Sequence, residues 1–327
     1  MRDIGLAGVP FSGKSTLFTA LTRTGAAGGR ANQAVVSVPD PRLAVLTEME
    51  NSAKTVAAQV RFVDVPGGTG SAQGIAGLRE TDALAIVVRA FGPDRDPAGE
   101  LEEVHAELLL ADLAIVEPAA EKAAKRARRD KTAGPEADAL AKAHAELADE
   151  RPLREAEISD ADARLLKGVA PLTLKPLVVV ANLEEGESMP EGLPADAVGV
   201  FASIEAETAE MPEDEARALL EEFGVETPGL DEVIHAGYRA LDLITFLTTG
   251  ADETRAWEVR RGAKAPEAAG AIHSDLERGF IRAEVIGYDE LVAVGSLDAA
   301  KHQGVLRVEG KDYVVVEGDI LNIRFAV

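Results

Sequence analysis

Gly8-Val9-Pro10-Phe11-Ser12-Gly13-Lys14-Ser15 is the stretch of this chain that decides its fold. Its glycines, Gly8 and Gly13, let the backbone curl tightly, so that successive N–H groups point inward at phosphate oxygens. A short apolar strand is predicted before the stretch, over residues 3–8, and a helix after it, over residues 14–22. The positive end of that helix faces the same phosphates. The pattern predicts a phosphate-binding P-loop; the alternative is a tight strand-to-helix turn without a ligand.

The side chains of this loop have separate predicted roles. Lys14 reaches the β- and γ-phosphates and is a catalytic candidate, and the Ser15 hydroxyl is a ligand of Mg²⁺. The other residues expected to contact the nucleotide belong to the loop and to the first helical turn: Gly8, Pro10, Phe11, Ser12, Gly13 and Thr16. The expected cofactors are therefore ATP or GTP, together with Mg²⁺.

A second motif, Asp64-Val65-Pro66-Gly67, follows an apolar strand predicted over residues 59–65. In P-loop enzymes an Asp at this place holds Mg²⁺ through water, and the Gly N–H meets the γ-phosphate. Asp64 is therefore a predicted metal residue, and Gly67 joins Lys14 as a catalytic candidate. Asp and Gly are also ordinary turn residues, but the buried strand before them and the P-loop upstream favour the functional interpretation.

Selection of the base is predicted for two later loops. Asn182-Leu183-Glu184-Glu185 follows a strand over residues 177–181, at the place where GTP-binding proteins carry Asn-Lys-x-Asp. Glu185 is one methylene longer than Asp and position 183 has no Lys, which favours adenine or relaxes selectivity. Asn182, Leu183 and Glu185 are candidate base contacts, and Ser203 and Ile204, after a strand over residues 197–202, are two more. The alternative is a polar turn that closes a strand.

The order of the predicted elements indicates an α/β doubly wound sheet. Continuous Val/Ile/Ala runs, such as residues 83–89 and 177–181, are typical of parallel strands that are buried on both faces. Between these two runs, apolar residues recur every three or four positions, which predicts a helical hairpin over residues 97–151. Pro118 is expected to kink or break its first arm. Ser159 is expected to cap a short helix that follows.

A different, mostly β pattern begins at about residue 241. Short strands are expected at residues 254–261, 280–286, 306–308, 313–316 and 320–326. We therefore predict three domains. Residues 1–96 and 169–240 form the P-loop domain, residues 97–168 form an inserted helical coiled-coil domain, and residues 241–327 form a small terminal domain.

Composition narrows the possible partners. The formal net charge is −23, from 57 acidic and 34 basic residues, which opposes binding of the whole surface to DNA or RNA. An exception is a basic run in the predicted hairpin, consisting of Lys122, Lys125, Arg126, Arg128, Arg129 and Lys131. This run is either a solvated helix end or a contact with ribosomal RNA. The absence of cysteine excludes disulfides and thiolate chemistry. With no signal peptide and no membrane-spanning run, we expect a cytoplasmic protein.

The chain resembles the YchF / Obg-like ATPase family over nearly its whole length. The stretches that carry the resemblance are GVPFSGKSTLF (8–18), VSVPDPRL (36–43), RETDALAIVVRAF (79–91), ELLLADLAIVE (107–117), KPLVVVANLEE (175–185), ASIEAETAEM (202–211), FLTTGADETRAW (246–257), AAGAIHSDLERGFIRAEVI (268–286) and EGKDYVVVEGD (309–319). The resemblance implies an Obg-type G domain, a coiled-coil insert and a C-terminal TGS-like β-grasp domain. It also implies a preference for ATP over GTP, associated with the pattern from Asn182 to Glu185, and association with ribosomes.

The chain departs from that family in its switch segments. Residues 25–38 are few and include no Thr, whereas the family has a Thr-bearing switch there that supplies a second Mg²⁺ ligand. The segment after Gly67 is also short. Residue 68 is Gly, where Ras-like proteins have a water-orienting Gln and the family has an apolar residue. The loop histidine of the family has no match, His105 is expected to be structural, and Arg30 is the basic residue of the short first switch.

Three functions remain open from the sequence. The first is a slow ATPase switch acting on the translation machinery, and the second is a GTPase of the same architecture. The third is a nucleotide-binding adaptor with little or no hydrolysis. Glu185 distinguishes the first two, and the shortened switches bear on the third. Because no side chain at position 68 orients water, unaided hydrolysis is expected to be slow.

Overall fold

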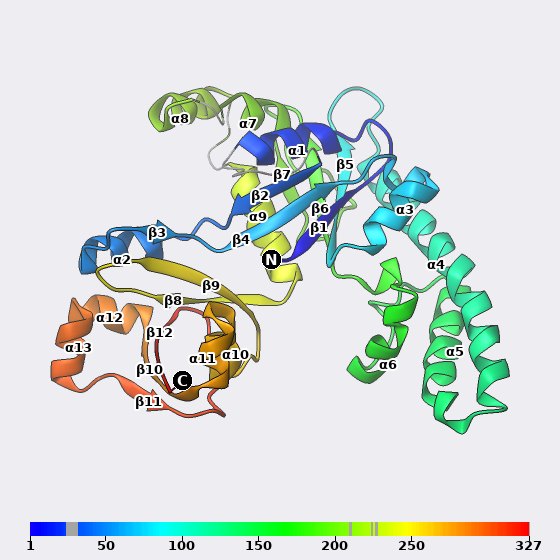
Figure 1. The fold of residues 1–327 in the computed structure, drawn as a ribbon. Coiled ribbons are helices and arrows are strands. Elements are labelled where there is room, and N and C mark those ends of the chain that lie inside the picture. Colours follow the sequence, from blue (N-terminus) through cyan, green and yellow to red (C-terminus); the bar gives the residue numbers. More distant parts are fainter. Residues whose placement is uncertain (24–31, 209–210, 224, 226–227, 327) are drawn as a thin grey trace. The chain divides into compact units, whose positions relative to one another are not determined.

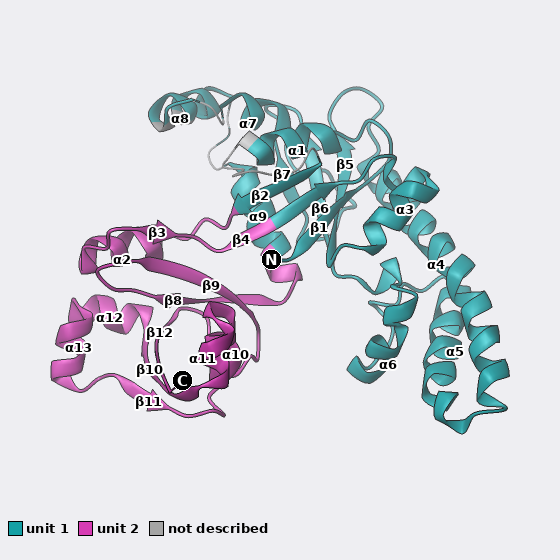
Figure 2. Ribbon diagram, viewed as in Figure 1, with its two compact units in different colours: residues 1–36, 61–237 teal, residues 37–60, 238–327 magenta. Residues whose placement is uncertain are grey.

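A computed structural model describes residues 1–23, 32–208, 211–223, 225 and 228–326 of the chain. These residues form two compact units, coloured separately in Figure 2. The first unit comprises residues 1–36 and 61–237, and the second comprises residues 37–60 and 238–327. The contacts group the helical insert with the first unit, and they group residues 37–60 with the C-terminal region. The predicted domain boundaries placed residues 37–60 in the P-loop domain instead.

The first unit contains a six-stranded sheet in the order β2-β4-β1-β5-β6-β7 (Figure 1). Its strands are β1 (Asp3–Ala7), β2 (Gln33–Ser37), β4 (Gln59–Asp64), β5 (Ala83–Ala90), β6 (Leu177–Leu183) and β7 (Val198–Val200). The pairs β1–β4, β1–β5, β5–β6 and β6–β7 are all parallel. Every residue of β5 except Arg89 is buried, as the continuous apolar runs predicted. The predicted α/β sheet is thus confirmed, and β2 is a strand that the sequence analysis missed.

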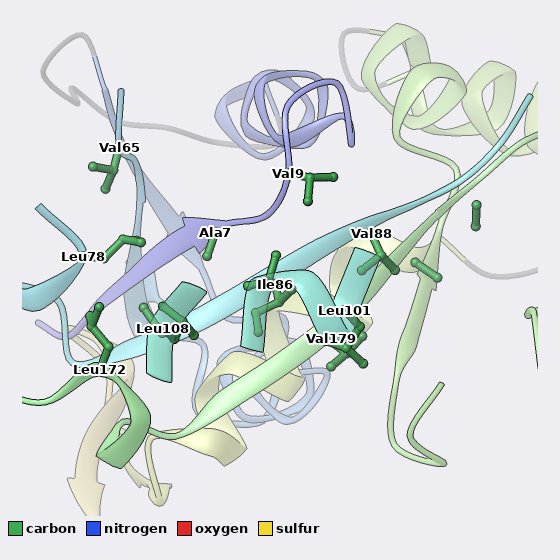
Figure 3. Close-up of a cluster of buried hydrophobic side chains, with 14 of the residues drawn as sticks. Ala7, Val9, Val65, Leu78, Ile86, Val88, Leu101, Leu108, Leu172 and Val179 are labelled. Atoms are coloured by element: carbon green, nitrogen blue, oxygen red, sulfur yellow. The ribbon is translucent and has the colours of Figure 1, made fainter. Parts of the chain in front are cut away.

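Helices cover this sheet and join its strands. They are α1 (Lys14–Arg23), α3 (Ala72–Arg79), α7 (Ala202–Thr208), α8 (Glu213–Glu222) and α9 (Gly229–Ala240), with the insert starting at α4 (Pro97–Ala127). Helix α1 packs with α7, and α4 packs on β5. Leu101 and Leu108 of α4 enter a hydrophobic core with Ile86 and Val179 of the sheet (Figure 3). The strands that carry the predicted motifs are therefore anchored in a buried hydrophobic core.

The insert is a helical hairpin of α4 and α5 (Gly134–Ala148), followed by α6 (Asp160–Leu165). Buried residues of both arms, such as Val116, Leu140 and Leu147, form a core of their own. Ser159 caps α6 by accepting the N–H of Asp162, as predicted. Helix α4 continues through Pro118 without ending, so the expectation of a break there is wrong. Packing along α5 compensates the hydrogen bond that a proline removes.

A buried ion pair anchors the hairpin to the sheet. Asp112 in the middle of α4 is fully buried and accepts hydrogen bonds from Arg79 (2.6 Å), from the N–H of Leu172 (2.9 Å), and from the N–H and hydroxyl of Thr173 (2.7 Å each). Arg79, the last residue of α3, also donates to the carbonyl of Ala111. A buried charge is tolerated only when its hydrogen bonds are met in this way. The network fixes the end of α3 to the root of the arm.

The second unit is built on another six-stranded sheet, in the order β11-β10-β12-β8-β9-β3. Its strands are β8 (Leu243–Thr248), β9 (Thr254–Arg260), β10 (Phe280–Gly287), β11 (Arg307–Glu309), β12 (Asp319–Phe325) and β3 (Thr55–Val56). Two antiparallel pairs, β8–β9 and β10–β12, meet through the parallel contact of β12 with β8. This is a β-grasp arrangement, extended at its edge by β3, which pairs parallel with β9.

Helices account for more of the second unit than the sequence predicted. They are α2 (Arg42–Glu50), α10 (Ala265–Ile272), α11 (Ser274–Arg278), α12 (Tyr288–Val294) and α13 (Leu297–Gln303). Strand β8 was also missed. The strand expected at residues 313–316 is reduced to a single antiparallel bridge between Val314 and Lys264, beside which the Val315 N–H donates to the carbonyl of Ala263 (3.0 Å). Asp319 ends this segment by accepting from the Tyr313 hydroxyl (2.7 Å) and the Val316 N–H (3.0 Å). Among the described residues, no helix is both long and apolar enough to cross a bilayer.

Candidate nucleotide-binding site

The loop between β1 and α1 has a backbone that only glycine adopts without strain at two positions. Gly8 has φ +144°, and a Cβ built on it would lie 2.4 Å from the carbonyl oxygen of Val87. Gly13 has φ +94°, and a Cβ there would lie 2.0 Å from the side-chain nitrogen of Asn182. Both glycines are thus required by conformation and by space. The loop ends at Lys14, where α1 begins, and the N-terminus of a helix is suited to bind phosphate.

Lys14 lies across this loop, half-buried. Its ammonium donates to the carbonyls of Gly8 (3.0 Å) and Val9 (2.6 Å). Burial lowers the pKa of Lys14, and the negative charges of Asp64, Glu100 and Glu107 oppose that shift. An ammonium group held across this loop is a suitable partner for the terminal phosphates of a nucleotide.

The two residues predicted to hold a metal, Ser15 and Asp64, lie next to each other. The Ser15 hydroxyl, in the first turn of α1, lies 3.4 Å from a carboxylate oxygen of Asp64, the last residue of β4. Among the described residues no group of three or more His, Cys, Asp or Glu side chains could hold a metal ion. This donor set fits Mg²⁺, which takes one or two protein ligands and completes its octahedron with water and phosphate oxygens.

The turn after Asp64 is also shaped by glycine. Gly67 (φ +83°) and Gly68 (φ +49°) lead into a single 3₁₀ turn, η1 (Gly68–Gly70), which is followed by α3. A Cβ on Gly68 would lie 3.6 Å from the Lys14 side chain, so this turn borders the lysine directly. A Cβ on Gly74 of α3 would lie 1.8 Å from the Gly68 carbonyl oxygen. The absence of side chains therefore lets η1 fit between the P-loop and α3.

The residues predicted to contact the base lie mainly at the end of β6 and in the loop after it, next to the loop after β5. Asn182 is buried, and its amide donates to the P-loop carbonyl of Ser12 (3.4 Å). Leu183 is buried in the core of the unit, whereas Glu185 is exposed and makes no hydrogen bond or ion pair with the described chain. The sequence analysis gave no role to Glu184, which accepts the N–H of Gly92 (3.0 Å) and so ties the two loops together. Backbone partners of this kind leave no sequence signal.

The remaining residues predicted to contact the nucleotide differ in their exposure to solvent. Pro10 and Phe11 are exposed at the tip of the P-loop, and Phe11 has φ +65°. Ser203 is exposed in the first turn of α7. The Ile204 side chain is buried against Leu220 and Val225, so only its backbone is available to a base. Thr16 is partly buried in α1.

Arg30 and His105, which the sequence analysis also considered, are not among the site residues described above. Residues 24–31, which include Arg30, lie outside the described residues. His105 is half-buried in α4, and burial lowers its pKa, with the nearby charge of Arg154 acting in the same direction. A further acidic residue, Glu100, had no predicted role. It accepts the N–H of Arg89 (2.7 Å) and so fixes the end of β5 beneath the P-loop.

Comparisons with known families and structures agree with this architecture. Residues 3–122 match the family model MMR_HSR1, described as a 50S ribosome-binding GTPase. Residues 243–326 match the model YchF-GTPase_C, described as a protein of unknown function (DUF933). Among solved structures, the Schizosaccharomyces pombe YchF GTPase has a TM-score of 0.89 at 28% identity, over 99% of this chain and 97% of its own. A GTP binding protein from Pyrococcus horikoshii OT3, at 21% identity and a TM-score of 0.65, shares the fold.

Curated relatives extend the similarity to the full length of the chain. The protein named ribosome-binding ATPase YchF from Bacillus subtilis (strain 168) is 39% identical over 361 residues, covering 99% of each chain. Its namesake from Escherichia coli O157:H7 is 37% identical over 360 residues, again covering 99% of each. Both alignments are longer than the 327 residues of this chain, so the relatives contain insertions that it lacks. At this identity and coverage, the chain belongs to the YchF family.

Proposed function

We propose that this chain is a Mg²⁺-dependent nucleoside triphosphatase that prefers ATP, hydrolyses it slowly and associates with the ribosome. The observation that supports it best is the convergence of Lys14, Ser15 and Asp64 at the glycine-shaped loop. On nucleotide binding, the Lys14 ammonium exchanges its two carbonyl partners for the β- and γ-phosphates. Ser15 and, through water, Asp64 hold Mg²⁺, which neutralises phosphate charge. The Gly67 N–H meets the γ-phosphate.

The preference for ATP is inferred from the base end of the site. Glu185 is exposed beside the loop that Asn182 anchors, and it replaces the shorter Asp with which GTP-binding proteins accept two guanine donors. The two relatives above are named as ATPases. A GTPase is the second candidate, because the S. pombe structure is described as a GTPase. Fluorescent-nucleotide titrations with ATP and GTP decide between them, and tighter binding of GTP would reject the ATP assignment.

Slow turnover follows from what the site contains. Transfer of a phosphoryl group depends on positioning water and on neutralising charge, and the described residues supply Lys14, Ser15, Asp64 and the Gly67 N–H. No side chain at position 68 orients water. We expect turnover well below the ~10 s⁻¹ typical of enzymes, rising with a partner. Several turnovers per second by the purified protein alone would contradict the expected slow hydrolysis. No hydrolysis with any partner would favour the adaptor hypothesis.

Ribosome association is inferred from the names of the relatives and from the basic run at the end of α4. Lys122, Arg128, Arg129 and Lys131 are exposed and make no ion pair within the described chain, whereas Arg126 pairs with Glu136 across the hairpin. Free cations at the tip of an arm suit a phosphate backbone. Reversing Arg128 and Arg129 to Glu, with Arg126 kept to preserve the hairpin, should weaken co-sedimentation with ribosomes and reduce its salt dependence. Co-sedimentation equal to that of the wild type at every salt concentration would show that this surface does not contact the ribosome.

A further inference from the structure

Two buried polar atoms without hydrogen-bond partners lie at the turn that follows Asp64, one in the turn and one in the helix that packs against it. The hydroxyl oxygen of Thr69, in η1, and one carboxylate oxygen of Glu107, in α4, are both buried and make no hydrogen bond. Thr69 as a whole is only 5% exposed. Folded proteins rarely leave such groups unpaired, because each loses its bonds to water without replacement. A pair of them beside a reaction site is therefore a sign of a role in the working state.

Thr69 belongs to a turn that borders the Lys14 side chain, and Glu107 belongs to a helix that packs against that turn. Thr69 follows Gly68, the residue whose added Cβ would lie 3.6 Å from Lys14. Helix α4 packs against η1, with its Leu101 and Leu108 turned to the sheet (Figure 3). Glu100 and Glu107 are seven residues apart on α4 and therefore share one stripe of the helix. The charges of both act on Lys14.

Glu107 differs from the other carboxylates of this neighbourhood. Asp64 is occupied by the Ser15 hydroxyl, and Glu100 by the N–H and guanidinium of Arg89. Within the described residues Glu107 makes no hydrogen bond and no ion pair, so its oxygens are available to a donor. Water is the donor that hydrolysis requires, and position 68 has no side chain to hold it.

We propose that Glu107 and Thr69 are positioning residues that hold the attacking water of hydrolysis, in place of the side chain missing at Gly68. Thr69 offers one unpartnered hydroxyl and Glu107 one unpartnered carboxylate oxygen to this water. The water oxygen bonds to the γ-phosphorus as the bond to the β–γ bridging oxygen breaks. The diphosphate keeps that electron pair, and the proton of the water leaves with the released phosphate.

This inference rests on the proposed triphosphatase function, and the test separates the two. Single-turnover hydrolysis of radiolabelled ATP is measured beside ATP affinity and thermal unfolding, in the full-length chain. Glu107→Gln and Thr69→Val should each slow hydrolysis, the first by about 10²-fold, with ATP affinity within about twofold. Their unfolding midpoints should be unchanged or higher, because each removes a poorly satisfied buried group. Thr69→Ser keeps the hydroxyl and should retain the wild-type rate.

The matched control is Glu103→Gln, one turn earlier on α4 and exposed to solvent, which should leave the rate unchanged. The double variant Thr69→Val/Glu107→Gln should be about as slow as Glu107→Gln alone, since both groups hold one water. Wild-type rates in Glu107→Gln, or a rate that falls only in step with the unfolding midpoint, would overturn the proposal. A wild-type protein that binds ATP but never cleaves it would overturn the triphosphatase function as well.

Discussion

The two ends of the nucleotide site are built from different materials. At the phosphate end, glycine conformations and main-chain N–H groups form the loop, and Lys14, Ser15 and Asp64 supply the charges. At the proposed base end, the candidate contacts are a few side chains at the end of β6 and in the loop after it, among them Asn182 and Glu185. On the proposed function, the binding of triphosphate depends mainly on the backbone of the loop, whereas the choice of base depends on the length of single side chains.

The largest expected effect is the loss of the phosphate end in Lys14→Ala. Removing the ammonium leaves the phosphates without a charge-assisted partner. Affinity for Mg-ATP should fall by about 100-fold, roughly 2.7 kcal/mol, and GTP should lose as much because the phosphates are shared. Isothermal titration measures both, with circular dichroism to check the fold. Lys122→Ala, an exposed lysine of the hairpin, is the control, and unchanged affinity in Lys14→Ala would refute the assignment of the loop.

A smaller loss is expected when the loop backbone is strained. Gly13→Ala forces a Cβ to within 2.0 Å of the Asn182 amide, at a φ that alanine avoids. Strain of this kind costs about 1–3 kcal/mol, so the affinity for ATP should fall by about tenfold or more, with some loss of stability. Gly70→Ala is matched to it, because a Cβ there meets nothing within 4 Å. Equal effects of the two substitutions would show that the loop is not shaped by Gly13.

The smallest effect is expected at the base end. Glu185→Asp shortens the exposed carboxylate by one methylene and should move the ratio of ATP to GTP affinity toward GTP by about tenfold, 1.4 kcal/mol. Inorganic triphosphate should bind this variant as it binds the wild type. Leu183 is buried in the core, where a lysine would be desolvated, so Glu185 is changed alone. Glu191→Asp, the same change at an exposed position, is the control, and a ratio unmoved by Glu185→Asp would separate Glu185 from base choice.

The phosphate end could be predicted from the sequence because its signals are local. The spacing of Gly8, Gly13, Lys14 and Ser15 encodes a conformation within eight residues, and the apolar runs encode buried parallel strands. Asp64 could be assigned from its place after such a strand. The β-grasp unit was predicted as a mainly β region, but its helices α10 to α13 were not, because short helices carry weak periodic signals.

What could not be predicted depends on contacts between distant residues. Glu184 accepts the N–H of Gly92 in another loop, and Glu100 accepts that of Arg89 in β5. Asp112 is satisfied by residues 33 and about 60 positions away. Thr69 and Glu107 carry no motif, and only burial without a partner distinguishes them. Residues 37–60 are held to the C-terminal unit by contacts between distant residues: the two-residue strand β3 pairs with β9, Ser52 donates to the carbonyl of Gly250, and Glu50 accepts the N–H of Leu297. Such two-residue strands have no sequence pattern.

One titration series tests the central claim most directly. ATP, GTP and inorganic triphosphate are titrated side by side into the wild-type chain in the presence of Mg²⁺. The account predicts that all three bind, that Lys14→Ala weakens all three, and that ATP binds more tightly than GTP. Triphosphate binding unaffected by Lys14→Ala, or GTP binding tenfold tighter than ATP, would contradict the division of the site into a phosphate end built by the loop and a base end set by Glu185.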